Sequence, residues 1–239
     1  MANRKIYLAG PEIFFPEADT IGSIHKKICK ANGFEGLYPL NNAIKGKTPE
    51  VTAKAIVEAN IKTIQACDYV IANLSNFRGT IENPACDSGT AWECGYALAL
   101  NKKVIAYTDN VNSIPKGIIN NIDLTVYNIS FNEIFTYLNT VIFKHLHNPI
   151  TQAILPLFFN LDPKSPDIQD ANAESAFFLG YRYGNGLSCS ATLTDYRTQI
   201  EKYGTTDQNG NKVENFGHCV NIMISCNTKI ISSTNNDIF

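Results

Sequence analysis

Two carboxylates stand six residues apart in the stretch from Cys86 to Ala97. Asp87 precedes Ser-Gly-Thr, and Glu93 lies in the segment after it, at a predicted loop-to-helix junction. A buried strand is predicted at 68–75, shortly before this junction. Open α/β sheets bind their ligands at the carboxyl ends of the strands. Two acids in such a place indicate glycosyl chemistry, in which one carboxylate attacks a sugar and the other moves a proton.

Glu93 is predicted to fall in about the first turn of its helix. Unpaired backbone N–H groups and the helix dipole favour an ionised carboxylate there. An ionised glutamate can attack an anomeric carbon and form a covalent glycosyl-enzyme, which passes the sugar to a second acceptor with its configuration kept. The alternative is a glutamate that only stabilises the helix, which is the commoner case for such a residue taken alone.

Asp87 also allows two interpretations. As a structural residue it would form an Asx turn or cap the helix. As a functional residue it would bind a nucleobase, or donate a proton to the base as the glycosidic bond breaks, and the second role requires a raised pKa. Gly89 lies two residues further on, where a stretch of small residues lets a ligand approach the backbone closely.

Two loops are predicted to reach the same edge of the sheet. The first opens with Gly10 after the first strand, and its Phe14 or Phe15 could stack on a planar base, although such aromatic residues more often fill the core. The second follows the third strand and holds Arg78, which could close over a substrate or remain solvated.

Composition excludes several classes of protein. The 239 residues are 44% hydrophobic and 18% charged with a formal charge of -2, which indicates a globular protein with no nucleic-acid partner. No apolar run approaches the roughly 20 residues of a membrane helix, and the start leaves no room for a secretion signal. Seven cysteines without a CxxC pair favour reduced thiols and a cytoplasmic protein.

Cofactor motifs are missing as well. The sequence contains neither GxGxxG nor a Walker loop, and its four histidines are scattered without metal-ligand spacing. Ser88 has no nearby histidine to serve as its base. The simplest mechanism therefore uses no metal and no organic cofactor.

Strand and helix signals alternate from the start, as in a parallel sheet covered by helices. Thr48 followed by Pro49 predicts a helix start, with an N-cap residue before a proline at the first helical position. Strands are predicted at 5–9, 35–38, 69–74, 103–107 and 124–127, and helices at 20–32, 48–67, from the acidic junction to 101, and at 130–145. The fold class is therefore α/β, with a doubly wound, parallel, five-stranded sheet that closes by about residue 147.

The second half of the chain contains a weak internal echo. Residues 176–181 (Ala-Phe-Phe-Leu-Gly-Tyr) parallel residues 91–96 (Ala-Trp-Glu-Cys-Gly-Tyr), and Thr194-Asp195 parallels an earlier Thr-Asp pair. Phe178 stands where Glu93 stands, so a second copy would be partial and unable to perform the same covalent step. The alternative is that two helices share a Gly-Tyr packing motif. We predict a catalytic domain over 1–147 and a partial, degenerate second unit over 148–239, with a surface connection at 162–167.

Several blocks together resemble the nucleoside 2-deoxyribosyltransferases. The resemblance covers 5–107 and returns at about 194–224. It is carried by Ile6-Tyr7-Leu8-Ala9-Gly10-Pro11 with Phe14, by Asn60 before Cys67-Asp68, by Phe77-Arg78-Gly79, by residues 87–97 and by residues 213–223.

This resemblance implies a flavodoxin-like fold and a two-step exchange of 2-deoxyribose between purine or pyrimidine bases, without cofactor. The partners implied are deoxynucleosides and free nucleobases. Glu93 matches the family's nucleophile, Asp87 the acid that contacts the base, and Tyr7 the tyrosine that orients the nucleophile. Asn60 matches a position that faces the base. Asn221 and Met223 match a tail motif that, in the family, reaches into a neighbouring subunit's site and holds the 5′-hydroxyl end of the sugar, so a homo-oligomer is expected.

The position of the tail motif departs from the family. In the family it comes shortly after the fourth strand and before the fifth. Here it comes only after the echo and is followed by a possible further strand at 229–232. We hypothesise that the segment 150–239 docks, within the chain or between subunits, in place of a neighbour's tail. An Asn221 far from every Glu93 would refute this.

Two other functions remain open at this stage. A deoxynucleoside or deoxynucleotide N-glycosidase of the same fold would use Glu93 identically in its first step and water in its second. A nucleoside-binding sensor would keep the pocket without turnover.

Overall fold

Strand β1 (Arg4–Ala9) illustrates why the sheet forms. Side chains alternate along a strand, so Ile6 and Leu8 enter the apolar core on one face while Tyr7 and Ala9 enter the core on the other. Both sets are buried. A strand that is apolar on both faces suits a parallel sheet with helices on either side.

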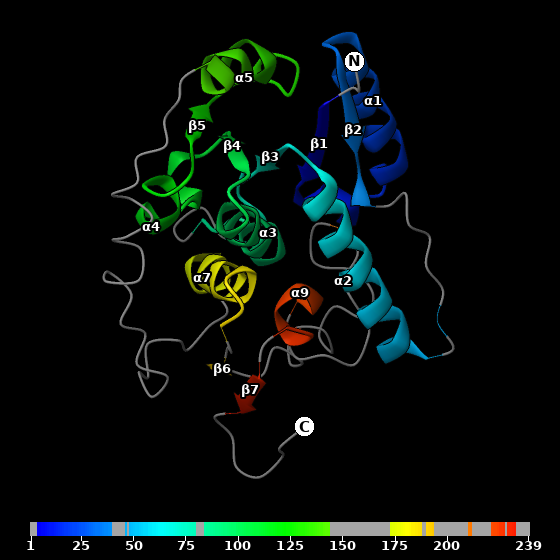
Figure 1. The fold of residues 1–239 in the computed structure, drawn as a ribbon, viewed down its shortest axis with the longest axis vertical. Coiled ribbons are helices and arrows are strands. Elements are labelled where there is room, and N and C mark those ends of the chain that lie inside the picture. Colours follow the sequence, from blue (N-terminus) through cyan, green and yellow to red (C-terminus); the bar gives the residue numbers. More distant parts are fainter. Residues whose placement is uncertain are drawn as a thin grey trace.

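The computed structural model contains this sheet, with five parallel strands in the order β2-β1-β3-β4-β5 (Figure 1). The other strands are β2 (Phe34–Leu37), β3 (Tyr69–Asn73), β4 (Lys103–Thr108) and β5 (Leu124–Tyr127). This is the flavodoxin-like order, and its topological switch point lies between β1 and β3. The predicted fold class is confirmed.

Helices cover both faces of the sheet. On one face lie α1 (Ala18–Ala31) and α5 (Ile134–Phe143), and on the other α2 (Pro49–Ala66) and α3 (Ser88–Ala99). The described residues up to 143 also include short helical segments at η1 (Pro11–Phe14), η3 (Val111–Ser113) and α4 (Lys116–Ile119). The start predicted for α2 is confirmed, because Thr48 is its N-cap and accepts a hydrogen bond from the backbone of Val51.

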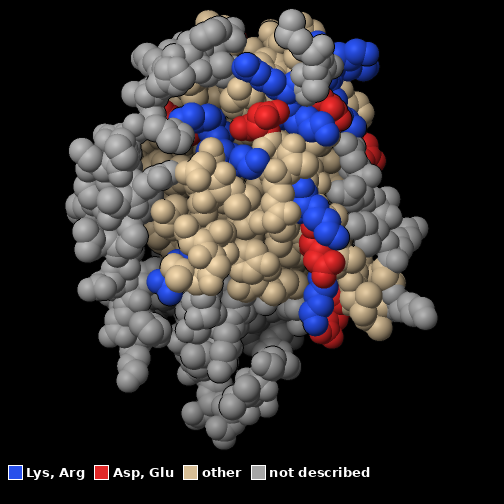
Figure 2. Space-filling model, in the orientation of Figure 1, with Lys and Arg blue, Asp and Glu red and all other residues tan. Residues whose placement is uncertain are grey.

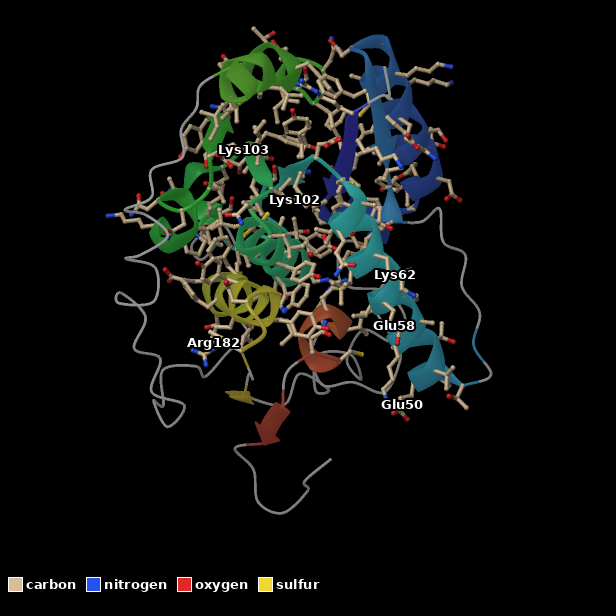
Figure 3. All side chains as sticks on the ribbon, in the orientation of Figure 1. Glu50, Glu58, Lys62, Lys102, Lys103 and Arg182 are labelled. Atoms are coloured by element: carbon tan, nitrogen blue, oxygen red, sulfur yellow. The ribbon has the colours of Figure 1, made fainter. Side chains whose placement is uncertain are left out.

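The outer side of α2 is charged. Lys54 pairs with Glu50 one turn away at 2.9 Å, and Glu58 and Lys62 are exposed on the same helix (Figure 3). Figure 2 shows blue and red side chains alternating along this helix, whereas the centre of the same view carries few charges. A buried residue of α2, Asn60, faces the interior instead.

The second half contributes α7 (Ala173–Gly184), β6 (Ser190–Leu193), α9 (Ile222–Ser225) and β7 (Lys229–Ser232). Helix α7 packs along α3, and α9 lies between α2, α3 and α7 (Figure 1). Strands β6 and β7 form a separate parallel pair. Helices α7 and α9 of the second half therefore lie against the helices that cover one face of the five-stranded sheet.

The structure describes residues 4–39, 46, 48–79, 84–143, 173–187, 190–193, 210–211, 221–227 and 229–232. The predicted connection at 162–167, the second Thr-Asp pair at 194–195 and most of the tail motif, 213–220, lie outside these residues. Among the described helices, none combines the length and the apolar character needed to cross a bilayer.

Candidate active site

The switch point between β1 and β3 gathers most of the predicted site. The loop 10–14 leaves the carboxyl end of β1, and the turn that carries Arg78 leaves that of β3. Helix α3 starts at the same edge, since Cys86 before it donates a backbone hydrogen bond to Ser113, just beyond β4. The parallel topology thus brings three loops to the place where doubly wound sheets bind ligands.

Tyr7 and Glu93 form the central contact of the site. The Tyr7 hydroxyl donates to Glu93 Oε1 at 2.6 Å, and both side chains are buried, Tyr7 at 0% and Glu93 at 6% relative exposure. Burial first, and then the Glu93 carboxylate, raise the pKa of Tyr7 well above its ordinary value. The hydroxyl therefore stays protonated and remains a donor. Tyr7 holds one oxygen of the carboxylate in a fixed position.

The position of Glu93 in its helix differs from the prediction. Helix α3 begins at Ser88, so Glu93 is its sixth residue and belongs to the second turn, and the first turn contains no acidic residue. The unpaired N–H groups of a helix belong to its first turn, and the dipole effect fades beyond it. The hydrogen bond from Tyr7, rather than the helix terminus, therefore holds this carboxylate.

Asp87 is the N-cap of α3. Its Oδ2 accepts from the backbone N–H and from the hydroxyl of Thr90, both at 2.8 Å, so the capping interpretation is correct. Asp87 is also buried, and burial raises the pKa of its carboxyl group although Thr90 and the charge of Arg78 oppose the shift. A raised pKa is what the proton-donor role requires. The cap and the chemical role are compatible in one residue.

Phe14 and Arg78 lie together at the carboxyl ends of β1 and β3. The ring of Phe14 stacks on Phe77 at 5.5 Å between centroids, and the guanidinium of Arg78 lies over both rings, 4.9 and 4.5 Å from their centroids. Phe14 is buried, so it packs as a core aromatic. Arg78 adopts φ 60°, a left-handed conformation that is uncommon outside glycine.

Glu12 is a buried acid that sequence reasoning missed. Its Oε1 accepts from Asn73 at 2.8 Å and from Tyr107 at 3.0 Å, and burial raises the pKa of its carboxyl group. A Cβ on Gly10 would collide with Glu12 Oε2, so Gly10 serves the loop by making room for this side chain. The sequence carries a signal for it, because an acid directly follows Gly-Pro at the end of a predicted strand.

The predicted tail residues reach the first half. The amide of Asn221 lies where a side chain on Gly89 would be, with Nδ2 2.6 Å from the position of a Cβ. Gly89 is one helical turn before Glu93, so Asn221 contacts the face of α3 that carries Glu93. Met223 receives a long contact from Asn60 Nδ2, 3.9 Å from its sulfur. Asn221 is therefore not remote from Glu93, whereas a remote Asn221 would have refuted the hypothesis that the second half docks on the first.

The Asn60 side chain has an unusual environment. Its Oδ1 is buried and finds no hydrogen-bond partner within the part of the chain that the structure describes. A buried acceptor without a partner costs about 1–3 kcal/mol, so its presence calls for an explanation. Over the same described residues, His, Cys, Asp and Glu side chains form no cluster suited to a metal ion.

Comparison with known proteins decides the family. The sequence profile described as "Nucleoside 2-deoxyribosyltransferase" matches residues 6–223, most of the chain. The chain belongs to this family. The resemblance found from the motifs is thereby confirmed.

Individual proteins similar to this chain match only part of its length. The uncharacterized protein C191.05c of Schizosaccharomyces pombe is 32% identical over 116 residues, which are 47% of this chain and 54% of the relative. The structure of a 2-desoxiribosyltransferase from Leishmania mexicana is similar with 33% identity and a TM-score of 0.38, over 45% of this chain and 65% of that one. The chain thus spans about half to two thirds of the length of these relatives.

Two further solved structures cover more of the chain at lower identity. A 2-deoxyribosyltransferase from Bacillus psychrosaccharolyticus is 21% identical with a TM-score of 0.46, over 57% of this chain and 95% of that one. A CMP N-glycosidase from Clostridium botulinum is 17% identical with a TM-score of 0.39, over 57% and 99%.

Proposed function

We propose that this protein is a nucleoside 2-deoxyribosyltransferase that exchanges 2-deoxyribose between purine and pyrimidine bases through a covalent deoxyribosyl-glutamate. Membership of the family supports the reaction class. The observation that carries the proposal is the buried contact in which Tyr7 donates to Glu93 at 2.6 Å, because it presents a fixed carboxylate to the site. A positioned nucleophile is what a retaining glycosyl transfer needs.

In the first step, a carboxylate oxygen of Glu93 bonds to C1′ of the deoxynucleoside as the bond from C1′ to the base nitrogen breaks. The electron pair of that bond goes to the base, and Asp87 donates the proton that neutralises it. In the second step, a nitrogen of the incoming base bonds to C1′, the bond to Glu93 breaks, and the proton of that nitrogen returns to Asp87. Two displacements on opposite faces retain the configuration.

The remaining residues bind the substrate. Asn60 supplies a buried acceptor, Oδ1, which has no partner among the described residues and can accept from an N–H of the base. Phe14 and Arg78 lie beside each other at the carboxyl end of the sheet, where the base would enter. Gly10 and Gly89 make room for the side chains of Glu12 and Asn221, which corrects the expectation that Gly89 leaves space for a ligand. Asn221 and Met223 close the sugar end. The reaction requires no metal or organic cofactor, since protein groups form the covalent bond and move the proton.

Product analysis tests this function. Deoxyinosine incubated with the protein and free adenine should give deoxyadenosine and hypoxanthine, with no deoxyadenosine when adenine is omitted. Acid-quenched samples with deoxyinosine alone should carry a deoxyribosyl group on the peptide that contains Glu93. Glu93→Ala should abolish both signals. Glu58→Ala, at an exposed glutamate of α2, is the matched control and should leave both unchanged.

Other outcomes identify the other functions. Free deoxyribose released at the same rate with and without adenine would mean that the protein is an N-glycosidase and would refute the transferase. Binding of deoxyinosine without any turnover would identify a nucleoside sensor. Preserved exchange in Glu93→Ala would eliminate the covalent route. A cytoplasmic location and a homo-oligomer remain predictions from the sequence.

A further inference from the structure

Helices α3 and α7 meet in a reciprocal contact. A Cβ on Gly95 of α3 would collide with the carbonyl oxygen of Phe177 and lie 2.8 Å from its carbonyl carbon. A Cβ on Gly180 of α7 would collide with the carbonyl oxygen of Trp92 and lie 2.9 Å from its carbonyl carbon. Each glycine thus lets the other helix's backbone approach closely.

A further pair of distances has the same symmetry. The Cβ position of Gly95 is 3.0 Å from the backbone nitrogen of Tyr181, and that of Gly180 is 3.0 Å from the backbone nitrogen of Tyr96. The sequence echo aligns these residues: Gly95 with Gly180 and Tyr96 with Tyr181. A contact in which residue i meets j while the counterpart of i meets the counterpart of j is the mark of a two-fold interface between like subunits.

The second half also completes the site of the first. Asn221 lies at the Gly89 face of α3, and Met223 contacts Asn60 across 163 positions of the sequence. Helix α9, which carries Met223 and is capped by Asn221, contacts α2 and α3 of the same chain. The substrate end that these residues close is therefore built from both halves of one polypeptide.

In the described part of the second half, the place that corresponds to Glu93 holds no acid. Phe178 occupies the place in α7 that Glu93 occupies in α3, and it is buried. Phenylalanine cannot attack a sugar or be oriented by a tyrosine hydroxyl. The backbone distances of the α3–α7 contact are therefore matched on the two helices, but only α3 carries a carboxylate at the matching position.

We propose that residues 148–239 are a partial second unit that takes the place of a partner subunit, so that each chain completes one active site by itself. This proposal rests on the proposed function for its active-site half. The α3–α7 contact fills the interface that a second copy of the chain would use. No second chain is then required for turnover, and the catalytic stoichiometry is one site per polypeptide.

Mixing two defective variants tests the proposal. Glu93→Ala keeps the second half intact but lacks the nucleophile, and Asn221→Ala keeps the nucleophile but lacks the contact to Gly89. Each variant alone should lose activity, Asn221→Ala by about 10-fold. If each chain builds its own site, co-expressed or co-refolded mixtures should show only the sum of the two separate activities.

Sites shared between chains would restore a calculable fraction of the activity. If sites were shared between chains, half of randomly formed dimers would pair the two variants, and each such dimer would hold one intact site of two. About a quarter of wild-type activity would then return, which would overturn the proposal. An Asn221→Ala variant with wild-type activity would overturn it as well, because the second half would then contribute nothing to the site.

A second readout needs no substrate. Trp92 is the only tryptophan of the chain, is fully buried, and packs against Tyr183 of α7. Gly180→Ala and, more strongly, Gly180→Leu should separate the helices and shift the Trp92 emission to the red while the far-UV circular dichroism persists. Ser23→Leu, on an exposed position of α1, is the control and should shift nothing.

These two readouts separate the failure of the docking from the failure of the proposed function. Unchanged Trp92 emission in both folded Gly180 variants would overturn the docking of α7 on α3, whatever the protein catalyses. A red shift in a protein that neither transfers nor releases deoxyribose would refute the proposed function and leave the docking established.

Discussion

The hydroxyl of Tyr7 gives the sharpest test of the role proposed for its contact with Glu93. Tyr7→Phe removes one oxygen and keeps the ring, which is fully buried between the sheet and α3. The change leaves Glu93 Oε1 without the donor that lies 2.6 Å away. A separation this short is typical of an O–H group bound to an ionised carboxylate.

The size of the effect follows from this hydrogen bond. A hydrogen bond to a charged group contributes about 1.5–3 kcal/mol. Since about 1.4 kcal/mol is a factor of ten in rate, kcat should fall about 10- to 150-fold near neutral pH. The acidic limb of the pH–rate profile should also move to higher pH, because a carboxylate that loses a hydrogen-bond donor is protonated more readily.

The assay is the formation of deoxyadenosine from deoxyinosine and adenine, followed by chromatography across the acid and neutral pH range. Tyr69→Phe is the matched control, since it removes a hydroxyl that only accepts a surface hydrogen bond from Arg4 at 3.1 Å. It should leave the profile unchanged. A Tyr7→Phe variant with an unmoved acidic limb and a wild-type kcat would refute the role given to this contact.

Three further predictions concern the neighbouring side chains. Asp87→Asn should keep the helix cap and the melting temperature while lowering kcat, whereas Asp87→Ala should lower kcat and also cost about 0.5–2 kcal/mol of stability in thermal unfolding; equal stability losses in both would contradict the separation of the two roles. Burial raises the pKa of Glu12, so the folded chain binds this proton more tightly than the unfolded chain, and the wild-type free energy of unfolding should fall as pH rises from 4.5 through the raised pKa. Glu12→Gln, whose amide oxygen can still accept from Asn73 and Tyr107, should lack that fall, and denaturant titrations that show parallel curves for both proteins would dismiss the argument. Asn60→Ala should lower kcat/KM about 2- to 10-fold by removing one neutral hydrogen bond to the base, and initial rates with purine and pyrimidine donors would reveal no change if Asn60 does not contact the base.

Most of the first half was predictable from local patterns. The alternation of Ile6, Tyr7 and Leu8 fixes a strand with two buried faces, and Thr48 before Pro49 fixes a helix start. These signals are local, because period and capping depend on neighbours in the chain. The predicted limits of the five strands therefore agree with the observed limits within one or two residues.

The departures depend on tertiary contacts. The helix turn that carries Glu93 was misplaced because the capping role of Asp87 shifts the helix start to Ser88. Glu12 was missed because its partners, Asn73 and Tyr107, come from two other strands. The roles of Tyr7 and Glu93 were expected from the family resemblance and remain a proposal, while their geometry, a 2.6 Å hydrogen bond across 86 positions, required the fold.

The pairing of α3 with α7 has a consequence for how this protein can change. When two identical copies meet on a two-fold axis, any substitution changes both sides of the interface together. Matching positions must then carry the same residue, so one could not be Trp and the other Phe, and a carboxylate could not be kept on one side alone. Here Trp92 and Phe177 occupy matching places, as do Glu93 and Phe178. If residues 148–239 replace a partner subunit as proposed, the two helices belong to one polypeptide and can mutate independently, so that α7 can serve packing alone while α3 keeps Glu93.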